Sequence, residues 1–473
     1  MTRRAGTFAS LIAALLAACV AFQLNASMLS PALVTMAREL RTDESTISLS
    51  QTLFFTLAAM FSVFLPRLSD IYGRRNVLLG MLAMMLLGSV VAALAVNVGM
   101  LFAGRIIQGV TGPVVPICLL MLRHEISDPR RYGAALGLLT AVNGGIAGVD
   151  ALVGGWLATN FGFRSLFWVI AATTVVAIAL VSVWGVESRP SAGTRMDWGG
   201  VVPLVVSVAS VLTAFNEAGK LGEANWLLVL ISLAVALISF GTFLAVEARV
   251  RVPLVEPRLL ARRGTWALLL TTLLTMTGVF AVVNGLVMSL AQNRDAGFGM
   301  PADVASLVFL TPYALVGWLV GPFAGRLAPS FGYRGVLRIG LIGSVVATGL
   351  MAFVGVHSMP VLVAATVLIG ITYAGIANII LNGLGIVLSP ASNPGFLPGL
   401  NAGAFNLGSG LSFAILPALQ LGLTETTGSA VAGYSGGILL GAAITLAALG
   451  TSFLIPRPAD AEAIRSTPRA AAE

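Results

Sequence analysis

The sequence predicts an all-α polytopic membrane protein with fourteen transmembrane helices. Of its 473 residues, 57% are hydrophobic and only 10% are charged, and the mean hydropathy is +0.95. A soluble globular domain carries roughly 25% charged residues, so a chain of water-exposed domains is excluded. The apolar residues fall into runs of the length that a membrane helix needs, about 20 residues. The alternating pattern of a membrane β-barrel, with strands of roughly ten residues, is absent.

The fourteen apolar segments are separated by short joints that contain Pro, Gly, Asp, Arg or Asn, as loops do. The segments cover approximately residues 8–30, 46–66, 75–96, 100–122, 132–157, 165–186, 198–216, 226–246, 264–291, 302–325, 335–355, 360–388, 397–421 and 431–455. An even number of spans places both termini on the same side of the membrane.

The basic residues indicate which side that is. Most of the 27 Lys and Arg residues lie in the terminal segments and the even-numbered joints. The opposite side carries only Arg38, Arg41, Arg164, Lys220 and Arg294. Because positive residues collect on the cytoplasmic side, both termini are predicted in the cytoplasm, in a multi-pass protein of the inner (plasma) membrane. The net charge of +8 therefore reports topology, and no nucleic-acid partner is expected.

Several chemistries are excluded by the residues that are missing. Cys19 and Cys118 both lie in apolar runs, which offers no disulfide framework and no thiolate metal site. The chain has no Gly-x-x-x-x-Gly-Lys-Ser/Thr loop, so it does not drive transport by ATP hydrolysis. His124 and His357 lie at span ends, which leaves no nucleophile–base pair for an enzyme. We expect no enzymatic activity, no catalytic residue, no metal and no cofactor.

Two short cytoplasmic turns resemble one another, one over residues 66–75 after the second segment and one over 321–334 after the tenth. They take equivalent places if segments 1–6 and 9–14 are repeats, which makes segments 7 and 8 an insert. Repeats of six helices are a known transporter architecture. We therefore expect three parts, namely an N-terminal six-helix bundle at 1–190, a linker with two extra helices at 191–260, and a C-terminal six-helix bundle with a short cytoplasmic tail at 261–473.

The first of these turns carries a family motif. The pattern Gly-x-Leu-Ala-Asp-Arg-x-Gly-Arg-Arg is matched at Leu68, Asp70, Gly73, Arg74 and Arg75. On this motif the chain resembles the major facilitator superfamily, and above all its fourteen-span drug:proton antiporter branch. The resemblance implies the major facilitator fold, with two linker helices added. It also implies that Asp70, Gly73, Arg74 and Arg75 form a cytoplasmic gate. The alternative for this turn is an ordinary solvated, charged loop.

Two further stretches support the resemblance, and one departs from it. Residues 105–109 are similar to the Arg-x-x-Gln-Gly of the family, and Asp197-Trp198 resembles the linker region of the branch. The antiporter pattern Gly-Pro-x-x-Gly-Gly, however, has Asp150-Ala151 in place of Gly-Pro. The main prediction is a proton-coupled secondary active transporter that exports a hydrophobic or amphipathic small molecule by alternating access. The alternative is a proton-coupled importer, a symporter of a small organic metabolite, and the departure at Asp150 favours it.

Asp150 is the one acidic residue in the interior of a predicted span, and Arg105 is its basic counterpart. At 1.5 Å per residue, Asp150 lies ~10 Å and Arg105 ~8 Å deep on consecutive helices. A charge in the membrane interior is costly and usually functional. We interpret Asp150 as the proton-coupling site, with Arg105 as its charge partner. A static ion pair that joins spans 4 and 5 is the alternative.

Polar side chains within spans form the last candidate set. In the family that the chain resembles, the first and fourth helices of each half line the cavity. That implies a substrate cavity formed by Gln23, Asn25, Gln108, Asn284, Tyr373, Asn378 and Asn382. Hydrogen bonds between helices, worth about 0.6 kcal/mol each, are the alternative role. The expected partners are a small-molecule substrate, protons and membrane lipid, and the protein is expected to be a monomer.

Overall fold

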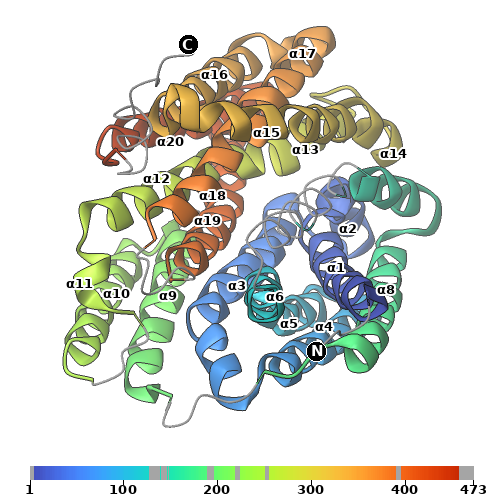
Figure 1. The fold of residues 1–473 in the computed structure, drawn as a ribbon. Coiled ribbons are helices and arrows are strands. Elements are labelled where there is room, and N and C mark those ends of the chain that lie inside the picture. Colours follow the sequence, from blue (N-terminus) through green and yellow to red (C-terminus); the bar gives the residue numbers. More distant parts are fainter. Residues whose placement is uncertain are drawn as a thin grey trace, which may run out of the picture.

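The structure is a computed structural model (Figure 1). It describes residues 5–126, 139, 146, 149–188, 196–218, 224–250, 255–389 and 396–457. All regular elements in these residues are helices, and they form 13 continuous helical stretches that are long and apolar enough to cross a membrane. Each overlaps one of the predicted segments, which confirms the fold prediction. The fifth segment, 132–157, lies mostly outside the described residues, but residues 149–161 are helical.

The helices that precede the linker are here called the N-terminal half. They are α1 (Ala5–Ser27), η1 (Ser30–Ala32), α2 (Leu33–Glu39), α3 (Glu44–Tyr72), α4 (Arg74–Ala93), α5 (Val98–Gln108), η2 (Gly109–Thr111), α6 (Val114–Glu125), the helical residues 149–161, and α8 (Phe163–Trp184). Helix α1 packs on α6 and α8, and α4 packs on α5 and α8. These helices gather at the lower right of Figure 1.

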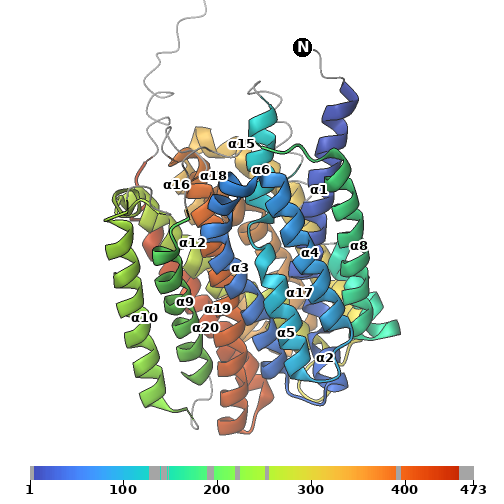
Figure 2. The same ribbon diagram turned by 90° about the horizontal axis from the view of Figure 1, so that it is seen from below.

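Two helices of the linker, α9 (Trp198–Ala218) and α10 (Trp226–Glu247), pack mainly on each other. Helix α9 also contacts the remaining bundle, at α3 and α19. The outward face of α10 exposes large apolar side chains such as Leu237, which is 74% exposed. A face of this kind suits contact with lipid rather than water. In Figure 2 the pair stands at one flank of the molecule.

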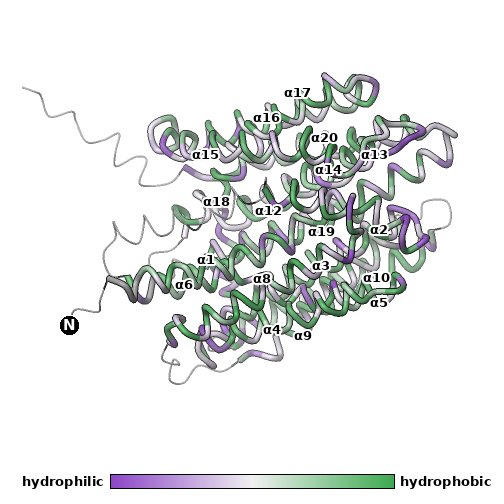
Figure 3. Tube along the Cα trace, turned by 90° about the vertical axis from the view of Figure 1, so that its right-hand side faces the viewer, coloured by the Kyte–Doolittle hydropathy of each residue, from purple (hydrophilic) through white to green (hydrophobic). Residues whose placement is uncertain are grey.

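The helices that follow the linker are here called the C-terminal half. They are α11 (Pro257–Leu260), α12 (Arg263–Ala281), η4 (Val282–Val287), α13 (Met288–Gln292), α14 (Ala302–Ala305), η5 (Ser306–Leu310), α15 (Thr311–Phe331), α16 (Tyr333–Phe353), η6 (Gly355–His357), α17 (Met359–Ile369), η7 (Gly370–Ala377), α18 (Asn378–Val387), α19 (Phe396–Thr427) and α20 (Ala430–Ser452). In Figure 3 the helices are hydrophobic over most of their length, and hydrophilic residues concentrate near the turns. The predicted domain limits at residues 190 and 260 stay predictions.

The two halves meet chiefly along α3 and α19. Phenylalanines from both halves contact one another there. The ring of Phe55 lies 5.2 Å from that of Phe280 and 6.4 Å from that of Phe413. Further along the same helices, Asn406 donates a hydrogen bond of 3.5 Å to the hydroxyl of Ser62. The centre of the molecule is therefore an aromatic seam between the halves.

A second junction lies at the end of the molecule that the positive residues predict to face outward, here called the outer end. Gln292 donates a hydrogen bond of 3.1 Å to the carbonyl oxygen of Pro31. The hydroxyl of Thr159 donates to a carboxylate oxygen of Asp303 over 3.1 Å. Because each of these bonds joins one half to the other, the outer end is closed in this conformation.

Candidate functional site

Asp150 is buried against α1. Its side chain is 1% exposed, and its Oδ2 accepts a hydrogen bond of 2.5 Å from the hydroxyl of Ser27. The same hydroxyl accepts a bond of 2.8 Å from Nε2 of Gln23, one helical turn earlier on α1. The second oxygen of Asp150, Oδ1, has no hydrogen-bond partner among the described residues. Asp150 therefore keeps a vacant acceptor position inside the N-terminal half.

Arg105, which is 0% exposed, lies among amides. Its Nη1 donates to Oδ1 of Asn25 over 2.8 Å and to Oε1 of Gln108 over 2.7 Å. Its Nη2 donates to Oε1 of Gln51, and its guanidinium carbon lies 4.1 Å from the ring centre of Phe54. Three amide oxygens and an aromatic face thus hold this buried cation.

The predicted ion pair between Arg105 and Asp150 is not present among the described residues. The reason lies in the helix between them. Arg105 binds Asn25 and Asp150 binds Ser27, which are two residues apart on α1. At 100° per residue, side chains two positions apart point to nearly opposite sides of a helix. Similar depth in the membrane therefore does not bring the two charges together, and the static-pair alternative loses its geometric basis.

Two of the three amides that Arg105 holds have NH₂ groups without a hydrogen-bond partner among the described residues. Because their oxygens face the guanidinium, the NH₂ groups of these amides point elsewhere. Nε2 of Gln108 donates to the hydroxyl of Ser89 over 2.8 Å. Nδ2 of Asn25 and Nε2 of Gln51 have no partner among the described residues. A buried donor without a partner costs free energy, so such groups commonly serve a ligand or a water.

The predicted cavity residues fall into two groups. Gln23, Asn25 and Gln108 belong to the network around Arg105 and Asp150. Asn284 lies in the π-helical element η4 and accepts a 3.4 Å hydrogen bond from Ser30 of the other half, so it too faces the junction. π-helical turns often occur at functional sites.

The structure does not bring the other three predicted cavity residues to this network. The hydroxyl of Tyr373 contacts the sulfur of Met276 at 2.8 Å inside the C-terminal half. Asn382 donates to Asn378 over 3.1 Å, and its own side chain is exposed in the middle of α18.

Sequence reasoning missed Gln51, Ser27 and Phe54. Gln51 is an amide within the second predicted segment, so the search for polar residues within spans could have found it. Ser27 and Phe54 carry no such signal, because serine and phenylalanine are common in membrane helices. Their role becomes visible only when the rotation of each helix about its axis is known.

The cytoplasmic turn is held together within the N-terminal half. Arg74 donates to Asp70 over 3.1 Å and to the carbonyl oxygen of Leu120 on α6 over 2.9 Å. Gly73 has φ +93°, which favours glycine, and Gly332 takes a similar φ of +86° at the equivalent turn of the other half. Among the described residues, the Asp70 carboxylate forms no hydrogen bond or ion pair with the C-terminal half, and its role as a gate stays a prediction.

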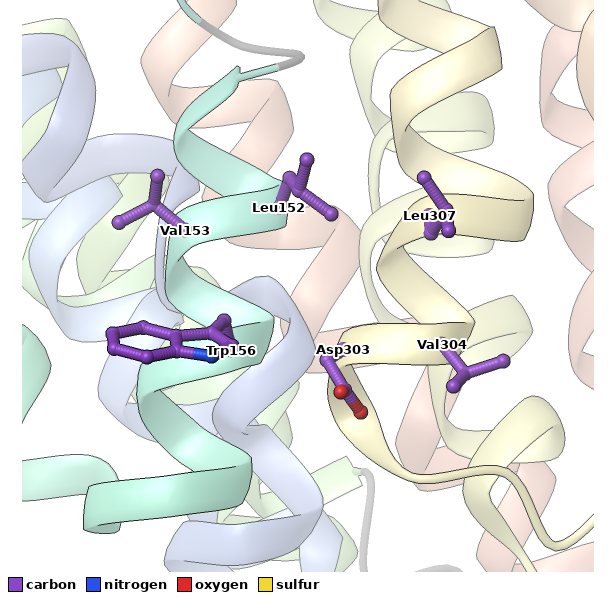
Figure 4. A pocket seen from close by; sticks show the side chains of 6 residues that line it. All are labelled: Leu152, Val153, Trp156, Asp303, Val304 and Leu307. Carbon is purple, nitrogen blue, oxygen red and sulfur yellow. The ribbon is translucent and has the colours of Figure 1, made fainter.

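One apolar pocket lies outside this network. It has a volume of about 400 Å³ and lies between the helical residues 149–161 and the start of the tenth span (Figure 4). Its lining is formed by Leu152, Val153, Trp156, Asp303, Val304 and Leu307. Trp156 and Leu307 are about half exposed, at 50% and 54%. An apolar pocket on a lipid-facing flank contains none of the predicted site residues, and it is not the candidate transport site.

Relatives of known function include transporters of different substrates. The chain is 51% identical over 461 residues to a uridine/deoxyuridine transporter of Lactococcus lactis subsp. cremoris, and the match covers 96% of each protein. It is 25% identical to the multidrug resistance protein Stp of Mycobacterium tuberculosis over 361 residues, which are 76% of this chain and 66% of that protein. The predicted drug exporter, with its antiporter and multidrug-resistance character, is wrong, because the match to the nucleoside transporter is far stronger.

Solved structures show the same fold. The human organic anion transporter MFSD10 (TETRAN) aligns with a TM-score of 0.64 at 15% identity, covering 95% of this chain and 99% of that one. A mutant of the nucleoside transporter NupG aligns with a TM-score of 0.60 at 12% identity, covering 94% and 99%. The family model of the Major Facilitator Superfamily matches residues 15–413. The chain is thus a multi-pass membrane transporter of small molecules, and it belongs to the Major Facilitator Superfamily.

Proposed function

We propose that this protein is a proton-coupled symporter that imports uridine and deoxyuridine by alternating access. The observation that carries the proposal is the 51% identity to a uridine/deoxyuridine transporter over nearly the whole of both chains. Asp150-Ala151 supports the direction of transport, because it stands where the antiporter pattern has Gly-Pro. A metabolite that serves growth is also expected to be taken up rather than expelled.

The amide network suits a nucleoside. Uracil presents two carbonyl oxygens, and the sugar presents hydroxyls, all of which accept hydrogen bonds. Asn25 and Gln51 hold donors that have no partner in the described part of the protein, and Arg105 fixes the direction of both amides. We assign these two amides to recognition of substrate oxygens, with Gln108 and Arg105 as positioning residues. The NH₂ groups are buried in this conformation, so they meet substrate in another state of the cycle.

Asp150 is the proposed proton-coupling residue. An intramembrane carboxyl group is a functional site by default, and this one has no cation beside it among the described residues. It can bind a proton on the vacant Oδ1 while Ser27 remains bonded to Oδ2. Because Ser27 and Asn25 belong to the same helix, a change at Asp150 can move α1 and with it the amide site.

The proposal also includes the predicted topology, oligomeric state and domain organisation. Both termini face the cytoplasm, the protein acts as a monomer in the plasma membrane, and lipid surrounds its apolar flanks. The two six-helix bundles at 1–190 and 261–473 rock about the central site, and the linker at 191–260 adds α9 and α10. The excess of Arg at the inner turns and the flank position of the α9–α10 pair support this arrangement.

Uptake in proteoliposomes tests the function. The purified protein is reconstituted, a pH gradient of either sign is imposed, and labelled uridine is followed. A gradient that is acidic on the substrate side is expected to drive accumulation above equilibrium, and the reversed gradient is not. Control liposomes carry the Asp150→Asn variant, which is expected to retain exchange but not accumulation. Absence of uridine exchange by the unchanged protein would overturn the substrate, and accumulation under the reversed gradient would overturn symport.

A further inference from the structure

A carboxyl group at the outer end joins the two halves. Glu44, the first residue of α3, accepts a hydrogen bond from the hydroxyl of Ser289 on α13. Ser289 in turn lies 2.6 Å from the hydroxyl of Tyr434 on α20, to which Asn293 donates over 3.4 Å. This chain of contacts, here called the outer latch (Glu44, Ser289 and Tyr434), runs from the N-terminal half into the C-terminal half.

Glu44 is only partly exposed, and its neighbours across the junction are apolar or neutral. Glu44 borders a small void that is lined by Leu33, Glu44, Ser48, Gly285, Leu286, Ser289, Pro417 and Gln420. None of these neighbours from α2, η4, α13 and α19 is charged. Among the described residues, the titratable groups that face Glu44 are Asp43, which precedes it in the chain, and Tyr434.

Glu44 has no basic partner in the part of the chain that the structure describes. No Lys, Arg or His there forms an ion pair with it, whereas Glu39 on the same end pairs with Arg164 at 2.9 Å. That neighbouring pair joins α2 to α8, so it lies entirely within the N-terminal half. Within the described residues, Glu44 therefore bonds across the junction and has no counter-charge. Glu39 bonds within one half and has a counter-charge, so it is a suitable control.

Closing this junction over a carboxylate is costly. A charge that is partly removed from water without a partner loses solvation free energy, and a neutral acid loses far less. The neutral acid can still bond to Ser289, because a hydroxyl both donates and accepts. Protonation of Glu44 thus favours the closed outer end, and loss of the proton favours opening.

We propose that Glu44 is a proton-binding site that controls the outer gate, with Ser289 and Tyr434 as the partners that hold it closed. Its proton arrives from the outer side and returns there, because the latch lies at that end. Glu44 therefore sets access to the cavity, whereas Asp150 is the residue proposed to carry the transported proton. The inference rests on the alternating access of the proposed function but on no particular substrate.

Cysteine labelling without substrate tests the proposal. Ser48, one turn along α3 from Glu44, is 5% exposed and lines the same void. In a background that lacks Cys19 and Cys118, Ser48→Cys is labelled from the outer side with a membrane-impermeant maleimide at a series of pH values. Each rate is divided by that of Phe161→Cys, an exposed outer position, to remove the pH dependence of thiol chemistry itself. The relative rate is expected to rise with pH.

Two variants decide the outcome. Glu44→Gln is expected to make labelling slow and independent of pH, because the amide mimics the neutral acid. Glu39→Gln is the matched control and is expected to retain the pH dependence. The proposal is overturned if Glu44→Gln keeps the dependence, or if Glu39→Gln removes it as well. Failure of uridine uptake leaves this measurement unaffected, so the two proposals fail separately.

The partners supply a second measurement, which decides the question if Glu44→Gln does not reach the membrane. Ser289→Ala keeps the carboxyl group and removes its contact across the junction. At acidic pH it is expected to accelerate labelling of Ser48→Cys about fivefold. Loss of one typical hydrogen bond raises the population of the open outer end by about that factor. Tyr434→Phe is expected to act in the same direction. Unchanged labelling in Ser289→Ala at acidic pH would overturn the proposal.

Discussion

Arg105 and Asp150 lie on opposite sides of α1 and do not meet. Arg105 is bonded to Asn25, and Asp150 is bonded to Ser27, two residues further along the same helix. Each buried charge therefore has its own polar surroundings. This separation assigns different tasks to the two residues, proton binding to Asp150 and orientation of amides to Arg105, and it makes the two tasks separable by mutation.

The first prediction concerns that separation. Asp150→Asn retains the hydrogen bond from Ser27, so the folded protein is expected to remain stable while proton-driven accumulation is lost. Arg105→Gln leaves buried amide oxygens unpaired, at a cost of about 1–3 kcal/mol for each unsatisfied group. Because the residues do not touch, the two changes are expected to add within about 0.5 kcal/mol. Thermal unfolding of the two single variants and the double variant measures this. Restored stability in the double variant would reveal an ion pair after all.

The second prediction concerns recognition. Arg105→Lys keeps the positive charge but replaces a planar, forked donor with a compact ammonium group, whose three donors do not reproduce the spacing of the fork that holds the three amides. Loss of one hydrogen bond to a charged group costs about 1.5–3 kcal/mol, so the affinity for uridine is expected to fall about tenfold or more. At saturating uridine the accumulation ratio is expected to stay unchanged, since Asp150 is intact. A lower ratio with normal affinity would contradict the assignment.

Hydropathy and charge were sufficient to predict the spans, because crossing a bilayer constrains composition and length directly. Hydropathy and charge predict how deep a residue lies in the membrane, but they do not predict how its helix is rotated about the helix axis. Asp150 and Arg105 are predicted to lie within spans and both are buried, yet whether they meet depends on the angle of each helix about its axis. The rise per residue does not contain that angle. The role of Glu44 is hidden from the sequence for a related reason, since its contact with Ser289 exists only where the two halves touch.

The prediction of a drug exporter failed for a different physical reason. The motif at Asp70, Gly73 and Arg74 builds a turn that any member of the family needs, whichever way it transports. Gly73 and Gly332 adopt the same left-handed backbone at equivalent turns. Such a motif identifies the fold and carries no information about the transported substrate. Asp150, where the sequence departs from the antiporter pattern, is the position that favours the proposed importer over an exporter.

The third prediction concerns topology. In an otherwise cysteine-free background, Phe331→Cys is expected to react with an impermeant reagent only from the cytoplasmic side, and Phe161→Cys only from outside. Both side chains are well exposed, at 69% and 65%. The side of the membrane from which the reagent arrives, and not burial of the side chain, therefore decides the result. The expectation follows from the excess of Arg at the inner turns. Labelling of position 331 in intact cells would invert the topology and contradict the positive-inside assignment.

The fourth prediction concerns the cytoplasmic turn. Asp70 and Arg74 are partly exposed, at 35% and 19% for their side chains, and they form an i,i+4 pair. Exposed pairs of this kind contribute about 0.3–0.5 kcal/mol, so Asp70→Asn is expected to change the unfolding free energy by no more than that. Slower uridine exchange is nevertheless expected, because the turn must contact the other half when the inner end closes. Normal exchange at normal expression would refute a gating role.

The last prediction separates the two acids that begin α3. Asp43 caps the helix, and its carboxylate accepts bonds of 2.7 Å and 2.6 Å from the backbone and hydroxyl of Thr46. Partial burial raises the pKa of Asp43, but the hydrogen bonds from Thr46 outweigh it, so the pKa lies below its usual value. A lowered pKa contributes stability that is present above the unfolded pKa and is lost as the pH falls through the folded one.

Asp43→Ala is therefore expected to lower the stability by about 1 kcal/mol at neutral pH, as removal of a helix cap does, and by less in strong acid. Asp43→Asn preserves a capping oxygen and is the matched control. Thermal unfolding across pH measures both. Neither variant is expected to alter the pH dependence of outer-gate labelling, because Asp43 bonds within its own helix and Glu44 bonds across the junction. A flattened profile in Asp43→Asn would transfer the gating role from Glu44 to its neighbour.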